Sequence, residues 1–224
     1  MAIITLLTDS GDQDFYVAAV KARILSINPG IRIEDISHHV RSGNIAHAAF
    51  ALRSVYREFP KGTVHLVGVD AVGRPGDGHV GIYFDDHYFV GPNNGVLSLL
   101  DPERQPQQVA ALNTIIPIQS TFPERDILAP AAAKIASGVA LTDLGKPATN
   151  YKRLTDRHFK ATRKLITGHV IHIDFYGNLI TNIPRDIFEQ VAGSRPYTVQ
   201  FGSERASKIN TAYHQVEPGE SFLI

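Results

Sequence analysis

Carboxylates follow two apolar segments of the sequence, at the point where each segment ends. Residues 3–7 form an apolar run that Asp9 follows, and residues 63–69 form a second run that Asp70 follows. In open α/β sheets, ligands bind outside the carboxyl ends of the strands. We therefore expect both carboxylates at one edge of one sheet. Because a carboxylate only accepts hydrogen bonds, Asp9 suits a ligand that presents two hydroxyls, such as a ribose.

The turn that contains Asp9 also carries Asp12 and Asp14. Asp14 precedes a helical pattern over residues 15–25, and we predict that it caps that helix. Asp12 is expected to face solvent. Taken by itself, the turn is equally compatible with three solvated carboxylates and no ligand.

Three more loops are predicted at the same edge of the sheet. The glycine-rich segment 71–78 contains Arg74, but it has neither the glycine spacing of a dinucleotide fingerprint nor the lysine of a P-loop. A turn at residues 92–95 contains Asn94, and a turn at 120–122 contains Phe122. Together these loops predict a site for a polar, hydroxyl-bearing small molecule with an aromatic group. A binding or regulatory module without chemistry remains the alternative at this point.

Other catalytic classes have less support from the sequence. His38, His39 and His47 could ligate a metal, but no acidic partner has metal-site spacing with them. The acidic turn lacks the glycine and the glutamate of a calcium loop. The chain has no cysteine and no nucleophile elbow, so we expect neither a thiol nor a serine nucleophile, and no metal.

Composition indicates an ordinary globular protein. The chain has 224 residues, of which 43% are apolar and 20% charged, and its formal net charge is zero. A neutral chain has no electrostatic footprint for nucleic acid or for a membrane surface. No signal-peptide pattern and no apolar run of membrane-spanning length occurs in the sequence. We therefore expect a cytoplasmic location.

The hydrophobic pattern over the first 70 residues alternates strand, helix, strand, helix, strand, which is typical of a parallel sheet with covering helices. Asn44 is expected to cap the second helix. Residues 79–91 read as a hairpin that turns at Asp85 and Asp86. An alanine-rich helix is expected over residues 127–137.

From about residue 139 the pattern becomes polar and then changes to short strands. We predict an α/β protein with an N-terminal parallel-sheet α/β domain over residues 1–145. A linker over 146–159 leads to a small, mostly β C-terminal domain over 160–224. Because the sequence stops within a strand pattern at residues 219–224, we expect that this domain is truncated.

Several blocks of the sequence match, in order, those of a known family. They are Thr8-Asp9-Ser10-Gly11 with Asp14-Phe15-Tyr16-Val17, Ile36-Ser37-His38, Phe59-Pro60-Lys61-Gly62, Pro92-Asn93-Asn94-Gly95, Ser120-Thr121-Phe122 with Arg125-Asp126, and Asp174-Phe175-Tyr176-Gly177-Asn178. On these blocks the chain resembles the S-adenosylmethionine hydroxide adenosyltransferases (SAM hydrolases), which are relatives of the fluorinase and chlorinase. The match extends over nearly the whole chain.

The resemblance implies a homotrimer in which S-adenosylmethionine lies between the N-terminal domain of one subunit and the β domain of the next. Asp9 would bind the ribose hydroxyls and Phe122 would line the pocket. Asp174, Tyr176 and Asn178 would contact the methionine or adenosyl end from the neighbouring subunit. The implied reaction is attack of water or hydroxide on the ribose 5′ carbon, which releases adenosine and methionine without a cofactor.

The sequence departs from the family at the catalytic water. The hydrolases are associated with an Asp-Arg-His triad, and Asp70 fits its first member. Asp77 stands at the position of the Arg, and Pro123 stands at the position of the His. Arg74 and His79, in or beside the same loop, are candidate replacements. The alternative is a non-catalytic protein that binds S-adenosylmethionine or adenosine. Halide chemistry is disfavoured because Asp70 places a negative charge near the position of the anion.

Overall fold

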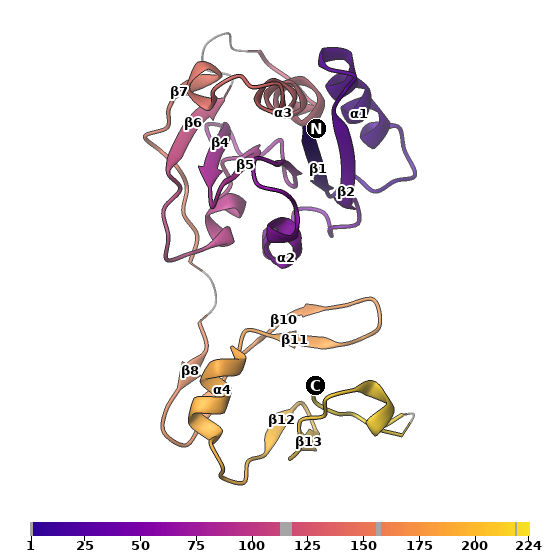
Figure 1. Ribbon diagram of the computed structural model, residues 1–224, viewed down its shortest axis with the longest axis vertical. Helices are drawn as coiled ribbons and strands as arrows, with labels where there is room; N and C mark the ends of the chain where they lie inside the picture. Colours follow the sequence, from indigo (N-terminus) through magenta and orange to yellow (C-terminus); the bar gives the residue numbers. More distant parts are fainter. Residues whose placement is uncertain (1, 113–117, 156–157, 218) are drawn as a thin grey trace. The chain divides into compact units, whose positions relative to one another are not determined.

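The structure is a computed structural model that describes residues 2–112, 118–155, 158–217 and 219–224. The chain divides into two compact units, Met1–Asp156 and Arg157–Ile224. The first unit is a large sheet covered by helices, and the second is built from short strand pairs and one helix (Figure 1). The predicted α/β class is confirmed.

Seven described strands form the sheet of the first unit, in the order β2-β1-β3-β5-β4-β6-β7. Their bounds are β1 (Ile3–Thr8), β2 (Arg32–Ser37), β3 (Val64–Gly68), β4 (His79–Phe84), β5 (His87–Pro92), β6 (Gln108–Leu112) and β7 (Gly145–Pro147). The strands β2, β1, β3 and β5 are parallel to one another, whereas β4, β6 and β7 run antiparallel to their neighbours. The sheet is therefore mixed, and the expected parallel pairing is confirmed only for its first half.

A hairpin reverses the direction of the chain between the two halves of the sheet. The strands β4 and β5 pair along their length and turn at Asp85 and Asp86, as the sequence predicts. Both residues have positive φ, at 55° and 62°, which is the backbone that a two-residue type I′ turn requires.

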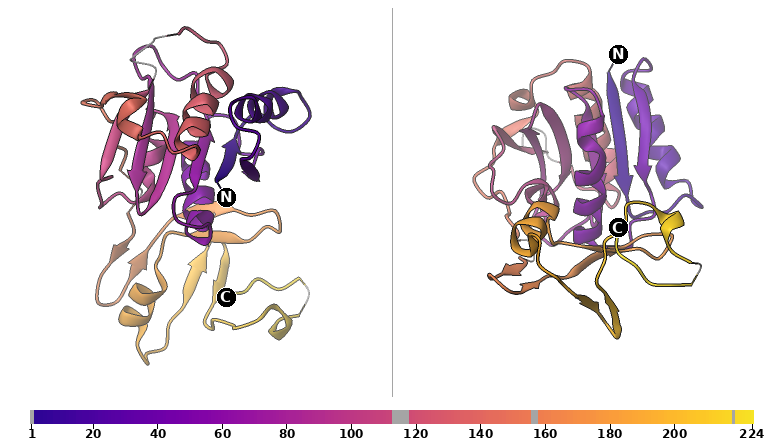
Figure 2. Two further views of the ribbon diagram at one scale, coloured as in Figure 1. Left: turned by 45° about the horizontal axis from the view of Figure 1, so that its top comes forward. Right: turned by 60° about the horizontal axis from the view of Figure 1, so that its bottom comes forward.

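Helices cover both faces of this sheet (Figures 1 and 2). They are α1 (Tyr16–Ile27), α2 (Ile45–Val55) and α3 (Ala129–Ala136), with a π-helical turn at Glu124–Leu128 and 3₁₀ turns at Tyr56–Glu58, Val96–Leu100 and Leu141–Asp143. Side chains of a strand alternate between the two faces. Leu6 of β1 accordingly packs in the cluster with α1 and α3, whereas Leu7 packs in the cluster with α2.

The two predicted helix caps have different outcomes. Asn44 caps α2 as expected, because its Oδ1 accepts a hydrogen bond from the backbone N–H of His47 at 3.0 Å. The prediction for Asp14 is wrong. Helix α1 begins at Tyr16, and Phe15 takes the capping position without a side-chain hydrogen bond. Asp14 therefore lies one residue outside the cap.

The described residues of the second unit form three two-stranded antiparallel sheets. Its elements are β8 (Lys160–Ala161), β9 (Ile166–Thr167), β10 (Val170–Ile173), β11 (Leu179–Thr181), α4 (Arg185–Ala192), β12 (Val199–Phe201), β13 (Glu204–Ala206) and a 3₁₀ turn at Tyr213–Gln215. Among the described residues of this unit only Asn210 is buried. Its apolar side chains are thus half-buried or exposed.

The sheet of the first unit extends into the predicted linker. Residues 146 and 147, which the sequence analysis assigned to the linker, pair with β6 in the sheet. In the part of the chain that the structure describes, no helix is long and apolar enough to cross a bilayer.

Candidate functional site

Asp9 joins three loops at the carboxyl edge of the sheet. Its Oδ2 accepts hydrogen bonds from the backbone N–H of Gly43, at 2.8 Å, and from that of Asp70, at 3.2 Å. These groups belong to the loops before α2 and after β3, and Asp9 itself follows β1. Both hydrogen bonds from described residues use Oδ2, so Oδ1 keeps its lone pairs for a ligand. The structure thus brings Asp9 and Asp70 together, as their positions in the sequence predict.

Asp70 is exposed, and its backbone is held in a left-handed conformation with a φ of +50°. Asn94 supports the strand end just before it. The Asn94 amide donates to the carbonyl of Val69 at 3.0 Å and accepts from the N–H of Val96 at 3.1 Å. Because Asn94 is buried and both ends of its amide are used, its side chain supports the edge beneath Asp70.

The loop after Asp70 has its own internal hydrogen bonds. The backbone N–H of Arg74 donates to Asp77 Oδ2 at 3.2 Å, and the Arg74 side chain is exposed. The Nε2 atom of His79 donates to the carbonyl of Ala71 at 2.9 Å. Burial lowers the pKa of His79, against a smaller opposite effect of that hydrogen bond. His79 therefore braces the loop as a neutral ring, and Arg74 is the side chain of this loop that remains available to a ligand.

Aromatic rings form a small surface beside this edge. Phe122 packs edge-to-face on Tyr16, with ring centroids 5.4 Å apart, and Phe15 stacks on Tyr16 at 4.7 Å. The Arg125 guanidinium lies over the Phe122 ring at 5.1 Å. Phe122 is partly buried against the core that α1 and α3 cover, whereas Phe15 is 66% exposed. Flat apolar faces of this kind suit the stacking of an aromatic ligand.

Glu124 is a residue of this edge that the sequence analysis missed. A Cβ atom on Gly68 would lie 2.7 Å from Glu124 Cγ, so the side chain of Glu124 lies directly over the glycine of β3. Burial raises the pKa of Glu124, and the charge of Asp9 adds to that rise, against the opposing effect of its own backbone N–H. Its carboxyl group therefore holds a proton to higher pH than an exposed glutamate does.

His38, which the sequence offered only as a candidate metal ligand and as part of a family block, follows β2 at the same edge. Its ring is 7% exposed, and its Nδ1 lies 2.8 Å from Thr8 Oγ1. Its Nε2 lies 3.2 Å from Asp35 Oδ1, without forming a well-aligned hydrogen bond. His38 follows a predicted strand, as Asp9 and Asp70 do, and ligands bind outside the carboxyl ends of such strands, so its position was the signal for a role at this edge.

The three predicted residues of the second unit lie in the turn between β10 and β11. Asp174 Oδ1 accepts from the backbone N–H groups of Tyr176 and Asn178, each at 2.9 Å, and its Oδ2 accepts from the Asn178 amide at 2.7 Å. The Asn178 side chain is the main cause that lowers the pKa of Asp174. Asp174 and Asn178 therefore shape the turn, while Tyr176 is 87% exposed and points outward.

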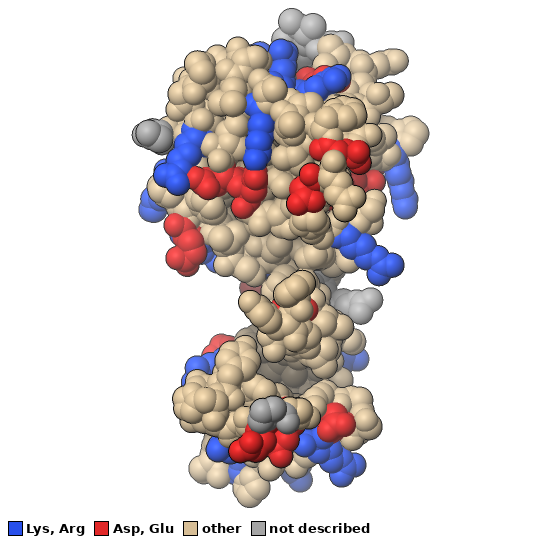
Figure 3. Space-filling model, turned by 90° about the vertical axis from the view of Figure 1, so that its right-hand side faces the viewer, with Lys and Arg blue, Asp and Glu red and all other residues tan. Residues whose placement is uncertain are grey.

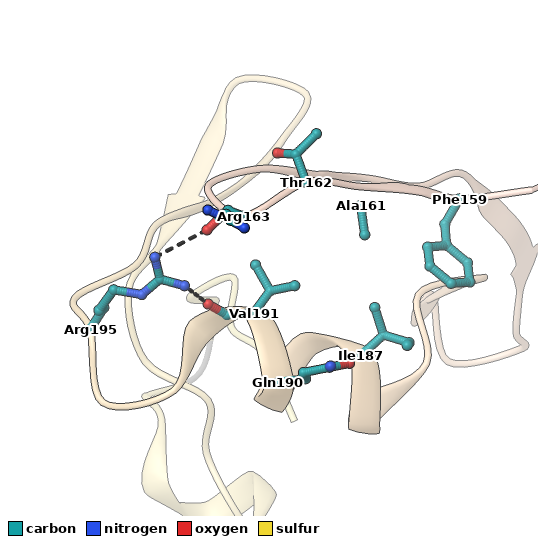
Figure 4. Close-up of a pocket in the computed structure, with 8 residues that line it drawn as sticks. All are labelled: Phe159, Ala161, Thr162, Arg163, Ile187, Gln190, Val191 and Arg195. Carbon is teal, nitrogen blue, oxygen red and sulfur yellow. Dashed lines mark hydrogen bonds between the residues drawn. The ribbon is translucent and has the colours of Figure 1, made fainter.

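A cavity of about 630 Å³ lies between α4 and the β8 region of the second unit (Figure 4). Apolar side chains of Phe159, Ile187 and Val191 line it, and Arg195 donates to the carbonyl of Arg163 at 3.0 Å at one end. None of the residues predicted for the site lines this cavity.

Neither the surface charge nor the arrangement of possible metal ligands points to a further site among the described residues. On the face drawn in Figure 3, basic and acidic side chains are interspersed, in keeping with the zero net charge. Among the described residues, no three His, Asp or Glu side chains are arranged to hold a metal ion.

Family models and relatives identify the class of protein. The model of the SAM hydroxide adenosyltransferase N-terminal domain matches residues 4–145, and that of the C-terminal domain matches residues 168–224. The chain belongs to the SAM hydroxide adenosyltransferase family, which confirms the resemblance seen in the sequence.

Named relatives and a solved structure agree with that membership. An (R)-S-adenosyl-L-methionine hydrolase of Thermus thermophilus is 34% identical over 222 residues, covering 90% of this chain and 84% of its own. One of Methanocaldococcus jannaschii is 34% identical over 201 residues, covering 82% of this chain and 68% of its own. A fluorinase of Actinoplanes sp. is 25% identical over 219 residues, covering 84% and 74%. The crystal structure of an uncharacterized conserved protein from Thermotoga maritima superposes with a TM-score of 0.86 at 32% identity, covering 97% of this chain and 86% of that one.

Proposed function

We propose that the protein hydrolyses S-adenosylmethionine by attack of water on the ribose 5′ carbon, giving adenosine and methionine. The observation that carries the proposal is the pairing of Asp9 with Asp70 at the carboxyl edge of the sheet, where Asp9 Oδ2 accepts the N–H of Asp70. This pairing puts an acceptor for a ribose diol next to an exposed carboxylate. Relatives at 34% identity that are named as S-adenosylmethionine hydrolases support the same reaction.

Five residues at this edge have a role in the proposed reaction. Asp9 Oδ1 accepts the ribose hydroxyls, and the rings of Phe122 and Tyr16 offer apolar faces to the adenine. Asp70 orients the attacking water in line with the carbon–sulfur bond. Arg74 is the exposed cation of the same loop and stands in for the arginine of the family triad. The sulfonium leaves as a neutral thioether, so the reaction needs neither a general acid nor a cofactor.

The proposal includes a homotrimer in which the second unit completes the site of the next subunit. Asp174 and Asn178 hold the turn that displays Tyr176, and this side chain would contact the methionine or adenosyl end. Apolar side chains exposed in numbers on a folded unit commonly mark an interaction surface. Phe175, at 98% exposed, lies beside Tyr176 in the same turn and supports such an interface.

The alternative is a non-catalytic binder of S-adenosylmethionine or adenosine. The observation that favours it is the state of the two substituted triad positions. Asp77 accepts the N–H of Arg74 within the loop, and Pro123 is buried at the start of the π-helical turn. Neither position offers a proton donor or acceptor equivalent to the residue it replaces.

Incubation with S-adenosylmethionine, followed by chromatography of the products, tests the proposal. We expect the wild-type protein to release adenosine and methionine. We expect Asp70→Asn to lower kcat by about 10²-fold, since misplacing a reacting group by about 1 Å can cost that factor, with little change in the dissociation constant. Asn tolerates the left-handed backbone at this position, so this variant removes charge without straining the loop.

Asp86→Asn is the matched control. Asp86 has the same left-handed backbone, with a φ of 62°, but it lies in the β4–β5 turn at the opposite edge of the sheet. It should leave turnover unchanged. Calorimetry separates the two candidate functions. Tight binding of S-adenosylmethionine without adenosine release supports the binder, and the absence of any binding defeats both.

A further inference from the structure

A line of hydrogen-bonding side chains runs from the edge of the site into the sheet. Ser10 Oγ lies 3.0 Å from Thr8 Oγ1, which lies 2.8 Å from His38 Nδ1. On the far side of the ring, His38 Nε2 lies 3.2 Å from Asp35 Oδ1. The four side chains come from the ends of the adjacent parallel strands β1 and β2 and from the loops that follow them. We call Ser10, Thr8 and His38 the hydroxyl–histidine chain.

The donors and acceptors of the hydroxyl–histidine chain follow from the tautomer of the neutral imidazole, which we assign from the carboxylate of Asp35, 3.2 Å from His38 Nε2. A carboxylate accepts but does not donate, so the His38 nitrogen that faces Asp35 carries the hydrogen. His38 Nδ1 is then an acceptor, and the hydroxyl of Thr8 donates to it. Thr8 Oγ1 in turn accepts from Ser10. Every donor of the chain points toward the histidine, so Ser10 Oγ keeps its lone pairs for a group outside.

The burial of its members shows which end of the hydroxyl–histidine chain is accessible to solvent. Thr8 is 2% exposed and His38 is 7% exposed, whereas Ser10 is half-buried. A Cβ atom on Gly68 would lie 3.3 Å from Thr8 Cγ2, so the methyl group of Thr8 faces β3 while its hydroxyl faces β2. Ser10 is thus the most accessible residue of the hydroxyl–histidine chain.

Ser10, the accessible end of the hydroxyl–histidine chain, belongs to the same turn as Asp9 of the proposed site. Asp9 stands between Thr8 and Ser10 in the sequence and is bonded to the N–H of Asp70. The histidine of the family triad is absent, since Pro123 has no titratable group. His79 is held against the carbonyl of Ala71, and its pKa is lowered by burial. Among the histidines considered, His38 is the one that a line of hydroxyl groups connects to this edge.

We propose that His38 is the final acceptor of the proton from the attacking water, reached through the hydroxyls of Thr8 and Ser10. This inference rests on the proposed hydrolase function. The water oxygen forms a bond to the 5′ carbon, and the carbon–sulfur bond breaks with its electron pair going to sulfur. One water proton moves to Ser10 Oγ, the Ser10 proton moves to Thr8 Oγ1, and the Thr8 proton moves to His38 Nδ1. The other water proton remains on the new 5′ hydroxyl.

Asp35 is placed to stabilise the imidazolium that forms. Burial raises the pKa of Asp35, but the hydrogen bond from Lys21 and the proximity of His38 outweigh that effect, and the pKa lies below its ordinary value. The Lys21 ammonium lies 2.6 Å from Asp35 Oδ2, and His38 faces the other oxygen. Asp35 is thus ionised when the proton arrives, as the carboxylate partner of a general base must be. Histidine is also the side chain used most often as a general base.

The substitution Thr8→Val tests the proposal because it removes one hydroxyl and keeps the shape of the side chain. The chain between Ser10 and His38 is then interrupted. We expect kcat to fall by about 10²-fold, the lower end of the factor that general base catalysis contributes. The dissociation constant of S-adenosylmethionine, measured by calorimetry, should change by less than about twofold. A purely structural role of Thr8 would instead weaken binding and turnover together.

Two control variants accompany this substitution. Thr8→Ser keeps the hydroxyl and should restore at least about a third of the wild-type kcat. Thr5→Val removes a hydroxyl that makes the same kind of bond in the same strand, from Thr5 Oγ1 to His65 Nδ1 at 2.7 Å, away from the edge. Its kcat should match that of the wild type.

The outcomes separate the relay from the proposed function. Thr8→Val with wild-type kcat, or with the same loss as Thr8→Ser, overturns the relay and leaves hydrolysis intact. A wild-type protein that binds S-adenosylmethionine but releases no adenosine overturns the hydrolase function, and the relay falls with it.

Discussion

His65 is a buried histidine that the proposed reaction does not use. It lies in β3 with no exposed surface. Its Nδ1 forms a hydrogen bond with Thr5 Oγ1 at 2.7 Å, and its Nε2 forms one with His87 Nδ1 at 3.1 Å. Its ring stacks on Phe89 with centroids 4.8 Å apart. Burial lowers the pKa of His65 to about 3, and the neighbouring His87 contributes to that shift. The folded protein therefore keeps this ring neutral at pH values where an unfolded chain protonates it.

The first prediction is a loss of stability in mild acid. The unfolded state gains a proton at His65 below pH 6.5, whereas the folded state does so only near pH 3. The unfolded state binds more protons between these values, so the free energy of unfolding falls as the pH falls through that window. One such group lowers it by up to about 1.4 kcal/mol per pH unit. Urea unfolding at pH 7 and pH 5 measures the slope.

The substitution His65→Phe should flatten that slope by about one proton, because it keeps an aromatic ring on Phe89 and removes the titration. His39→Ala, at a histidine that is exposed in the loop after β2, is the control and should leave the slope unchanged. Equal slopes for the wild type and His65→Phe would show that this ring does not govern the acid response.

At the scale of elements, the turn after β5 carries two adjacent side-chain amides, Asn93 and Asn94, that form hydrogen bonds with the backbone of other segments. Asn94 bonds the carbonyl of Val69, just before Asp70. Asn93 donates to the carbonyl of Asn150 at 3.0 Å and accepts from the N–H of Lys152 at 2.9 Å. The two side chains are both buried, but they hold different segments.

The second prediction compares these neighbours. Asn94→Ala leaves two buried backbone groups without partners and should lower the free energy of unfolding by about 1–3 kcal/mol per group left unsatisfied. It also frees the strand end that carries Asp70, so kcat should fall by more than the loss of folded protein explains. Asn93→Ala should lower stability similarly and leave kcat per folded molecule unchanged. Equal kcat values for the two variants would contradict a role of Asn94 in positioning Asp70.

Local patterns predicted most of the first unit and much less of the contacts at its edge. Alternating apolar runs gave β1, α1, β2, α2 and β3 in order, and the Asp85-Asp86 pair gave the hairpin, because both signals depend on residues close in sequence. The pairing of β6 and β7 with this hairpin and the contacts of His38, Glu124 and Asn94 were not predicted. Those features depend on strand order and register, such as the pairing of Thr8 with Gly68, which join segments about 60 residues apart.

At the scale of the whole molecule, the second unit has almost no interior of its own. Its described apolar side chains remain half-buried or exposed, and the turn at Phe175 and Tyr176 is the clearest case. The third prediction is that the protein is a trimer in solution, with a mass three times the 24.6 kDa of one chain. Light scattering coupled to size exclusion measures that mass, and a monomer at micromolar concentration would contradict the assembly.

A substitution at Tyr176 tests whether the second unit contributes to the S-adenosylmethionine site of the next subunit. Tyr176→Ser should weaken S-adenosylmethionine binding, because Tyr176 would contact the ligand of the next subunit. Tyr213→Ser, at a tyrosine of the same unit that is 60% exposed, serves as the control and should bind S-adenosylmethionine as the wild type does. Equal affinities for all three proteins would remove Tyr176 from the site.

The left-handed backbone of Asp70 limits how this protein can change over generations. Aspartate, asparagine and glycine adopt such a conformation readily, and branched or bulky residues do not. In the genetic code, asparagine and glycine are each one base away from aspartate. Mutation can therefore remove the carboxylate without disturbing the loop. The backbone N–H of residue 70 would still donate its hydrogen bond to Asp9 Oδ2. A single codon change could therefore remove the proposed catalytic carboxylate and leave the backbone of the loop as it is.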